Sequence, residues 1–325
     1  MEKTTQVLLI GLVLLVTLAY GGAKAYIHYK AGDGVDAAVL YMAPYASLEY
    51  GGISSTLSGE LTIDDVRLKI NGYRDDIYIG RLGITTPNFL TLLKLSNQAA
   101  ASQGSDASPP EYIGLIAEEI RVPVMADYYS DLHEKNIKAI APSDIRQRGV
   151  QCVGKYGYSP RALIALGYDE LTMSMSVILR QTDGRYITEM NFDIADMAKM
   201  EVDVTLAGSP MAAAVGGAAY LPGLHSLQVK MTDNSLNQRI EKYCTDLGLS
   251  QAQIQRAHLN ALQYAGSSMG IEFDEYVINP YKEYLNGKSV FTMTARPRQP
   301  LQLTSISKYK PSDVPALLNL EASAQ

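Results

Sequence analysis

The sequence predicts an α+β fold in which an N-terminal transmembrane helix precedes a curved antiparallel β-sheet packed with several helices. Three observations lead to this prediction. The run Thr4–Ala23 contains 20 residues and no charge. Two later blocks alternate apolar and polar residues with the period of a half-buried strand. Serine residues stand at helix-capping positions in the remaining segments.

The uncharged run has the length of a membrane span, because about 20 helical residues cover the roughly 30 Å of bilayer hydrocarbon. We therefore expect a transmembrane anchor over residues 7–27, after a cytoplasmic tail of residues 1–6. Ala23-Lys24-Ala25 also has the small-x-small form of a signal peptidase site, so a cleaved signal peptide is the alternative.

The orientation of this anchor is predicted from two opposed signals. Lys24 and Lys30 come after the span whereas only Lys3 precedes it, which favours a cytoplasmic body. A very short N-terminal tail is typical of a signal anchor that exports the rest of the chain. We expect export, and hence a single-pass protein of the inner membrane with the bulk of its chain in the periplasm.

The first block of alternation lies between Leu57 and Ile84 and indicates a hairpin. Its apolar phase slips at Asp64-Asp65, and the return strand slips at Gly80-Arg81 after an Asn71-Gly72 turn. Matched slips in facing strands predict bulges and a strongly twisted, curved hairpin.

The second block predicts a meander of three strands with one apolar and one polar face. Leu171–Leu179 holds five alternate apolar positions, Asp183-Gly184 turns the chain, and Tyr186–Ile194 runs back. Met200–Leu206 continues in phase. Leu227–Met231 and Phe291–Ala295 are candidates for a fourth and a fifth strand.

Helices are expected where serine precedes a helical apolar pattern. The pairs Ser235/Gln238 and Ser250/Gln253 have capping-box spacing, and Ser159-Pro160 opens a short helix. Ser312 is expected to cap a last helix that carries Leu317, Leu318 and Leu320.

The low-complexity segment Ala99–Pro110 predicts a flexible linker. It divides a β-hairpin unit, residues 40–98, from an α+β domain, residues 111–325.

Composition excludes some classes of protein. Hydrophobic residues make up 47% and charged residues 19% of the chain, as in folded proteins. The formal net charge of −6 disfavours nucleic acid as a partner.

No motif nominates a catalytic, cofactor-binding or metal-binding residue, so we expect neither a cofactor nor a metal. The four histidines are far apart in sequence and lack metal-ligand spacing. Cys152 and Cys244 are the only cysteines, and in an exported domain they can form a disulfide. Two unpaired buried thiols are the alternative.

The apolar face of the predicted meander is rich in methionine, whose flexible side chain adapts to irregular partners such as lipid chains. This face is the candidate ligand site, with ordinary core packing as the alternative. Its candidate residues are Met173, Met175, Val177 and Met190.

The pattern S-x-L-S-G-x-L-x-I-x-D-V-x-L at Ser55–Leu68, within Gly51–Pro87, is similar to strand repeats of AsmA-like envelope proteins of Gram-negative bacteria. The chain also looks like the uncharacterised single-pass envelope proteins of these bacteria. The resemblance implies a periplasmic body and lipid handling, and it transfers no site residues.

We therefore expect a non-enzymatic, membrane-anchored protein that binds an envelope protein partner or an apolar or lipid ligand. An envelope hydrolase with a site assembled from distant residues is one alternative, and a structural assembly factor is the other. An apolar groove at Met175, Val177 and Met190 favours ligand binding, whereas a cleft that gathers His133 or His225 with several carboxylates favours an enzyme.

Overall fold

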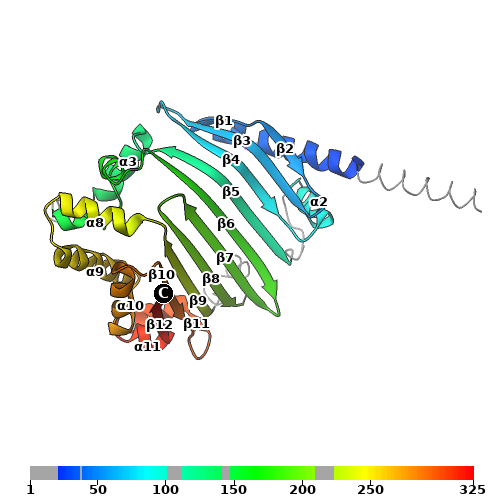
Figure 1. Ribbon diagram of the computed structural model, residues 1–325. Coiled ribbons are helices and arrows are strands. Elements are labelled where there is room, and N and C mark those ends of the chain that lie inside the picture. The colour runs from blue at the N-terminus through cyan, green and yellow to red at the C-terminus, as the bar shows by residue number, and fades with distance from the viewer. Residues whose placement is uncertain (1–20, 37–38, 101–110, 139, 141–146, 209–222) are drawn as a thin grey trace, which may run out of the picture.

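The computed structural model describes residues 21–36, 39–100, 111–138, 140, 147–208 and 223–325. These residues form an α+β fold built on one large antiparallel sheet (Figure 1). Along the sheet the strands follow the order β1-β3-β4-β5-β6-β7-β8-β9-β10-β12, while β2 pairs with β3 and β11 with β9. The strands are β1 (Ala46–Glu49), β2 (Gly52–Ser55), β3 (Glu60–Ile70), β4 (Asp76–Thr85), β5 (Tyr112–Pro123), β6 (Glu170–Thr182), β7 (Arg185–Ile194), β8 (Ala198–Ala207), β9 (Gly223–Asp233), β10 (Val290–Ala295), β11 (Leu301–Gln302) and β12 (Leu320–Ala324).

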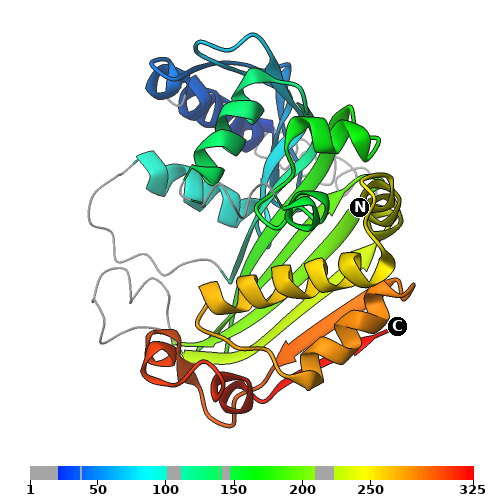
Figure 2. The same ribbon diagram turned by 90° about the vertical axis from the view of Figure 1, so that its left-hand side faces the viewer.

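The helices lie mainly on one face and at one end of this sheet (Figure 2). α9 and α10 lie across the C-terminal strands, and residues of α10 pack with Phe291 of β10. Residues 21–36 and 39–42 are helical. The helices that follow are α2 (Phe89–Ala100), α3 (Asp127–Ile137), α5 (Arg148–Cys152), α6 (Pro160–Ala165), α8 (Leu236–Asp246), α9 (Gln251–Ser268), α10 (Glu275–Leu285), the 3₁₀ helix η2 (Leu303–Lys308) and α11 (Val314–Leu318).

The predicted membrane anchor is corrected by the structure. Within the residues that are described, no helix combines the length and the apolar character that crossing a bilayer requires. Residues 21–27, the described part of the predicted span, belong to a helix over residues 21–36. This helix carries Lys24, Lys30 and Asp33, and charged side chains are costly in hydrocarbon. The predicted single-pass, inner-membrane location with a periplasmic body rested on this anchor and is corrected with it. The predicted tail of residues 1–6 lies outside the described residues. Residues 1–20, which held most of the predicted span, lie outside the described residues.

The predicted meander is confirmed, together with its fourth and fifth strands. β6, β7, β8, β9 and β10 pair in sequence order, all antiparallel. Asp183 and Gly184 both have positive φ, 50° and 70°, as the two-residue turn between β6 and β7 requires. Period-2 alternation was a reliable signal here because one face of each strand is apolar and the other polar.

The predicted phase slip is present in the first hairpin. Asp64 lies opposite Arg81 and Val66 opposite Ile79, and between them Asp65 adopts φ 54°. The slip continues into β5, a strand that sequence analysis did not identify, where Glu119 has φ 53°. β6 has no matching extra residue, so the β5–β6 register shifts between Ala117 and Ile120.

One of the two predicted capping boxes is formed and the other is absent. Ser250 and Gln253 form their box, and Ser159 accepts a hydrogen bond from the Ala162 amide at 3.2 Å. The Ser235 hydroxyl instead donates to the Asp196 carbonyl, so its capping box is absent.

The last predicted helix is shorter than expected. α11 begins after Asp313 and not after Ser312, and it ends at Leu318 because Asn319 turns into the left-handed region with φ 47°. Leu320 therefore starts β12 and belongs to no helix.

The predicted division at 99–110 does not divide the sheet. β4 pairs with β5 over Tyr78–Thr85, so strands from both predicted units are neighbours. Residues 99 and 100 belong to α2, and 101–110 lie outside the described residues.

An apolar groove as the candidate functional site

Two rows of apolar side chains cross β3, β4, β5 and β6 on the face of the sheet that carries the helices. One row runs through directly opposed residues, namely Leu61, Ile84, Leu115 and Val177. The second row is Ile63, Leu82, Ala117 and Met175. Directly opposed residues in antiparallel strands share a face, so the rows lie side by side.

These rows line an open groove with a volume of about 380 Å³. None of its lining residues carries a charged or polar side chain. Three of them are well exposed for their type, with 38% exposure for Leu82, 54% for Leu115 and 38% for Met175. A contiguous exposed apolar surface of this kind is typical of a binding site.

Asp65, Gly80 and Glu119 are extra residues at the same level of β3, β4 and β5, and they explain why the apolar face stays continuous across the phase slip. Met173 and Met175, two positions apart on β6, share a face, and they oppose Ile120 and Ala117 respectively. The three-residue step from Ala117 to Ile120 therefore keeps both side chains on the apolar face, with the extra residue Glu119 between them. A Cβ on Gly80 would approach the Glu119 Cβ to 2.9 Å, so glycine is required beside it.

The groove is the uncovered part of a longer apolar face. The same rows continue through Met190 and Phe192 on β7 to Met200 and Val202 on β8. Farther along, Met231 and Met293 pack against the cluster of Phe273, Val277, Tyr284 and Phe291. Among the described residues, helices thus cover the C-terminal half of this face, whereas the groove half carries no such cover.

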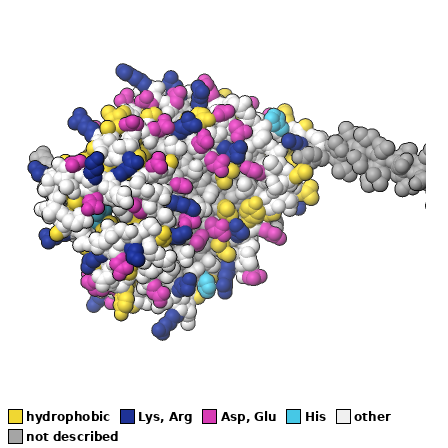
Figure 3. Space-filling model, in the orientation of Figure 1, with side chains coloured by type: hydrophobic (Ala, Val, Ile, Leu, Met, Phe, Trp, Pro, Cys, Tyr) yellow, Lys and Arg dark blue, Asp and Glu magenta, His cyan; other side chains and the backbone are white. Residues whose placement is uncertain are grey.

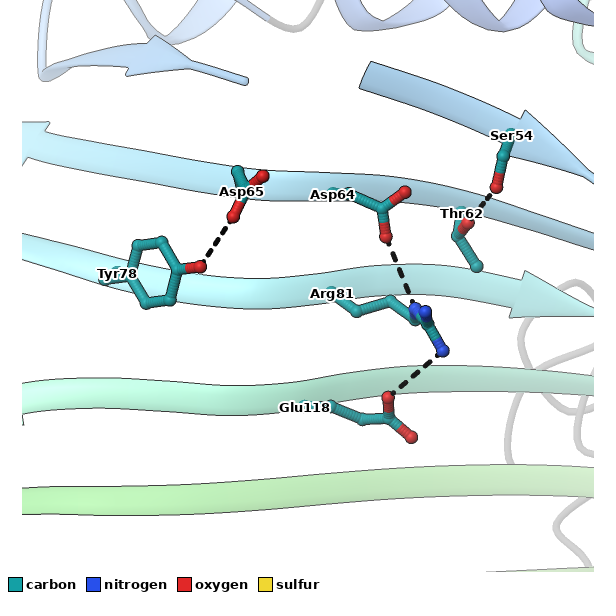
Figure 4. A network of polar contacts seen from close by, with 7 residues as sticks. All are labelled: Ser54, Thr62, Asp64, Asp65, Tyr78, Arg81 and Glu118. Atoms are coloured by element: carbon teal, nitrogen blue, oxygen red, sulfur yellow. Dashed lines mark hydrogen bonds and ion pairs between the residues drawn. The ribbon is translucent and has the colours of Figure 1, made fainter. Parts of the chain in front are cut away.

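The opposite face of the sheet carries charges in a cross-strand network (Figure 4). Arg81 lies 3.3 Å from Asp64 and 3.6 Å from Glu118, and the Tyr78 hydroxyl donates to Asp65 at 2.6 Å. These groups are about half exposed, so each ion pair contributes at most about 1 kcal/mol. Figure 3 shows acidic and basic side chains intermixed over the side of the molecule seen in Figure 1. The two faces of the sheet therefore offer different chemistry.

The four predicted ligand-face residues divide between two environments. Met175 and Val177 line the groove, and Met190 lies directly opposite Val177 on β7. Met173 instead packs against the cluster that contains Cys152, Leu171 and Ile240. A ligand-binding role for these residues stays a prediction. The contributions of β3, β4 and β5 to the groove were not predicted, although the alternation in Tyr112–Pro123 was a usable signal for β5.

Cys152 of α5 and Cys244 of α8 are joined by a disulfide, with their Cα atoms 5.2 Å apart. Both side chains are fully buried among Val124, Leu163 and Ile240. Neither cysteine lines the groove, and the disulfide joins α5 to α8.

The histidines form no catalytic cluster in the described part of the chain. His258 on α9 is 8% exposed, and burial lowers its pKa to about 4. His133 borders a cavity of about 370 Å³ that also contacts Arg161 and Tyr243 but no carboxylate, and burial lowers the pKa of this histidine. Across the described residues, no three His, Cys, Asp or Glu side chains gather closely enough to hold a metal ion.

A second polar cavity lies between α8 and the end of α10. Its volume is about 450 Å³, and its charged lining residues are Asp233, Glu241 and Lys288. The remaining lining residues are mainly the amides of Asn and Gln, so this cavity offers neutral hydrogen-bond donors and acceptors.

The match found among families of known proteins covers only the C-terminal part of the chain. A family model described as "Uncharacterized protein" matches residues 191–325, less than half of the chain. No curated protein matches. The matched region contains none of Gly51–Pro87, so the resemblance of that segment to AsmA-like proteins stays a prediction.

Proposed function

We propose that this protein is a non-enzymatic binding protein that holds an apolar ligand in the groove across β3–β6. The observation that carries the proposal is a groove lined by apolar side chains alone, which no other part of the described chain fills. Its volume of about 380 Å³ lies in the range of about 300–1,000 Å³ typical of ligand sites.

The energetics of the sheet support binding at this position. Apolar surface gains about 25 cal/mol for each Å² removed from water. On the C-terminal strands this gain is realised within the chain, since Phe273 and Val277 pack against the face. Leu82, Leu115 and Met175 have no such cover among the described residues, so an apolar ligand supplies it.

The test is binding of the neutral fluorescent probe N-phenyl-1-naphthylamine to wild type and to Leu115→Glu. Leu115 is 54% exposed, so the substitution is compatible with folding. A charge in an apolar site disfavours the probe by more than about 1.4 kcal/mol, so we expect at least about a tenfold loss of affinity.

Leu132→Glu is the matched control, because Leu132 on α3 is 56% exposed and does not line the groove. We expect this variant to bind the probe like wild type. Equal binding by Leu115→Glu and wild type, or no saturable binding by either, would refute the proposed site.

A further inference from the structure

A small recess adjoins the polar cavity between α8 and the end of α10. The cavity has a volume of about 450 Å³ and the recess one of about 20 Å³. The two share five lining residues, namely Asn237, Glu241, Gln251, Leu285 and Asn286. None of the residues that line the apolar groove lines either of them, so this is a separate place on the molecule.

The recess is also lined by His258 of α9, a buried side chain that lacks a hydrogen-bond partner among the described residues. Neither ring nitrogen of His258 is fully enclosed by protein, so the imidazole is accessible from the recess. Burial keeps the ring neutral by lowering its pKa to about 4. A neutral imidazole has one nitrogen that accepts a hydrogen bond, and buried polar groups normally have a partner. A group that donates a hydrogen bond within the recess would supply this partner.

The other polar groups of the recess favour a donor that carries positive charge. Glu241 is its only charged lining residue, and within the described part of the chain this carboxylate forms no ion pair. Gln251 and Gln255 add amide oxygens, which accept hydrogen bonds. A volume of about 20 Å³ holds about one water-sized group. An ammonium group has this size, donates three hydrogen bonds and complements the carboxylate.

The larger cavity offers a cation and several amides. Lys288 lines the cavity but not the recess, and it forms no ion pair with any residue that the structure describes. Asp233 accepts a hydrogen bond from the backbone amide of Asn237 at 3.0 Å. Asn234 and Gln238 present side-chain amides, which pair with peptide groups through one donor and one acceptor. The volume lies in the range of about 300–1,000 Å³ typical of small-molecule sites.

We propose that this cavity binds a short peptide with free termini. The terminal ammonium group lies in the recess, where Glu241 supplies the opposite charge and His258 an acceptor. The terminal carboxylate lies towards Lys288, and the peptide groups bond the Asn and Gln side chains of the larger cavity. The ligand thus brings together partners for an unpaired carboxylate, an unpaired ammonium group and a buried imidazole.

The experiment is isothermal titration calorimetry of the full chain with trialanine, its N-acetyl form and its C-terminal amide. We expect saturable binding of trialanine. The acetylated peptide should bind at least about tenfold more weakly, because acetylation removes the charge and adds a group larger than the recess. The C-terminal amide should bind about three- to tenfold more weakly, because it loses the charged partner of Lys288.

Variants of the two charged lining residues test their assigned roles. Glu241→Gln should weaken trialanine binding about three- to tenfold and reduce the penalty for acetylation. Lys288→Gln should reduce the preference for trialanine over its amide. Both positions are exposed, so these substitutions are compatible with folding. Glu283→Gln is the matched control, because Glu283 on α10 is exposed and lines neither the cavity nor the recess.

Several outcomes would overturn this inference. They are an absence of saturable trialanine binding, equal binding of trialanine and its acetylated form by wild type, and an acetylation penalty that is undiminished in Glu241→Gln. A loss of affinity in Glu283→Gln as large as that in Glu241→Gln would also overturn it. Failure of the apolar groove to bind its probe leaves this inference unaffected, because the two sites share no lining residue.

Discussion

At the scale of single residues, burial of a polar group has consequences that depend on its partners and its charge. Ser55 and His258 are both more than nine-tenths buried, yet they differ in kind. Ser55 carries no charge, and its hydroxyl has no hydrogen-bond partner among the described residues, so the cost of burying it does not depend on pH. His258 shares its helix face with buried Ile254, and desolvation lowers its pKa, so its effect is on stability.

His258 predicts a loss of stability in mild acid. Its pKa falls from 6.5 to about 4 on folding, so below pH 6.5 the unfolded state binds the proton and the folded state does not. The stabilisation is complete above pH 6.5 and is lost as pH falls towards 4, by an amount of about 3 kcal/mol. Urea unfolding of wild type and His258→Gln across this range measures it. A variant whose free energy of unfolding falls as steeply as that of wild type would contradict the prediction.

At the scale of secondary-structure elements, the extra residue shared by β3, β4 and β5 keeps the groove rows in phase. Asp65 and Glu119 adopt positive φ, and Gly80 leaves room for the Glu119 side chain. Each strand adds its extra residue at the same level, so the pairing register between these strands is preserved. The apolar face therefore depends on a backbone feature as well as on apolar side chains.

Gly80→Ala should destabilise the protein by about 1–3 kcal/mol, because the new methyl group would lie within 2.9 Å of the Glu119 Cβ. Chemical denaturation measures the change. Gly52→Ala is the matched control, since a Cβ there meets nothing within 4 Å. Combining Gly80→Ala with Glu119→Gly removes the clash and should restore most of the loss; a double variant as unstable as Gly80→Ala would exclude this explanation.

The disulfide between α5 and α8 closes a loop with a sequence separation of 92 residues. In the chain-entropy description such a crosslink stabilises the folded state by about 4–5 kcal/mol. We expect the Cys152→Ser/Cys244→Ser variant to lose about this much in chemical denaturation. On nonreducing gels the denatured wild type should migrate ahead of its reduced form, and identical migration would show that the cysteines do not pair.

At the scale of the whole molecule, one sheet connects segments that are far apart in sequence. The groove takes Leu61 and Leu82 from the predicted hairpin unit and Leu115 and Met175 from the predicted α+β domain. Neither segment contains a complete site. Ligand binding and the folding of the central strands are therefore expected to be coupled.

Residues 40–98 expressed alone should not fold stably. In the full chain β4 pairs with β5 from Tyr78 to Thr85, and the isolated hairpin would expose that edge and its apolar face. Small antiparallel units without a covered face are marginal in water. Circular dichroism with thermal melting tests this expectation, with the full chain as the control. A cooperative transition in the isolated segment would show that it is an independent unit.

The sequence by itself determined several of the strands in which one face is apolar and the other polar, although not β5. The alternation from Leu171 to Leu206, the turn at Asp183-Gly184 and the slip at Asp64-Asp65 all lie within short stretches, so local patterning was sufficient. The uncharged N-terminal run was a local pattern as well, but the membrane helix predicted from it was wrong among the described residues.

Only the tertiary structure decided which apolar surfaces are covered. Alternation shows that Met175 and Met231 face a core side, but it does not show that helices bury Met231 while Met175 lines an open groove. Likewise, the pairing of Ser55 with Leu61 places the serine hydroxyl on the apolar face, where no described residue bonds it. Such distinctions arise from contacts between distant segments, and a local pattern carries no information about them.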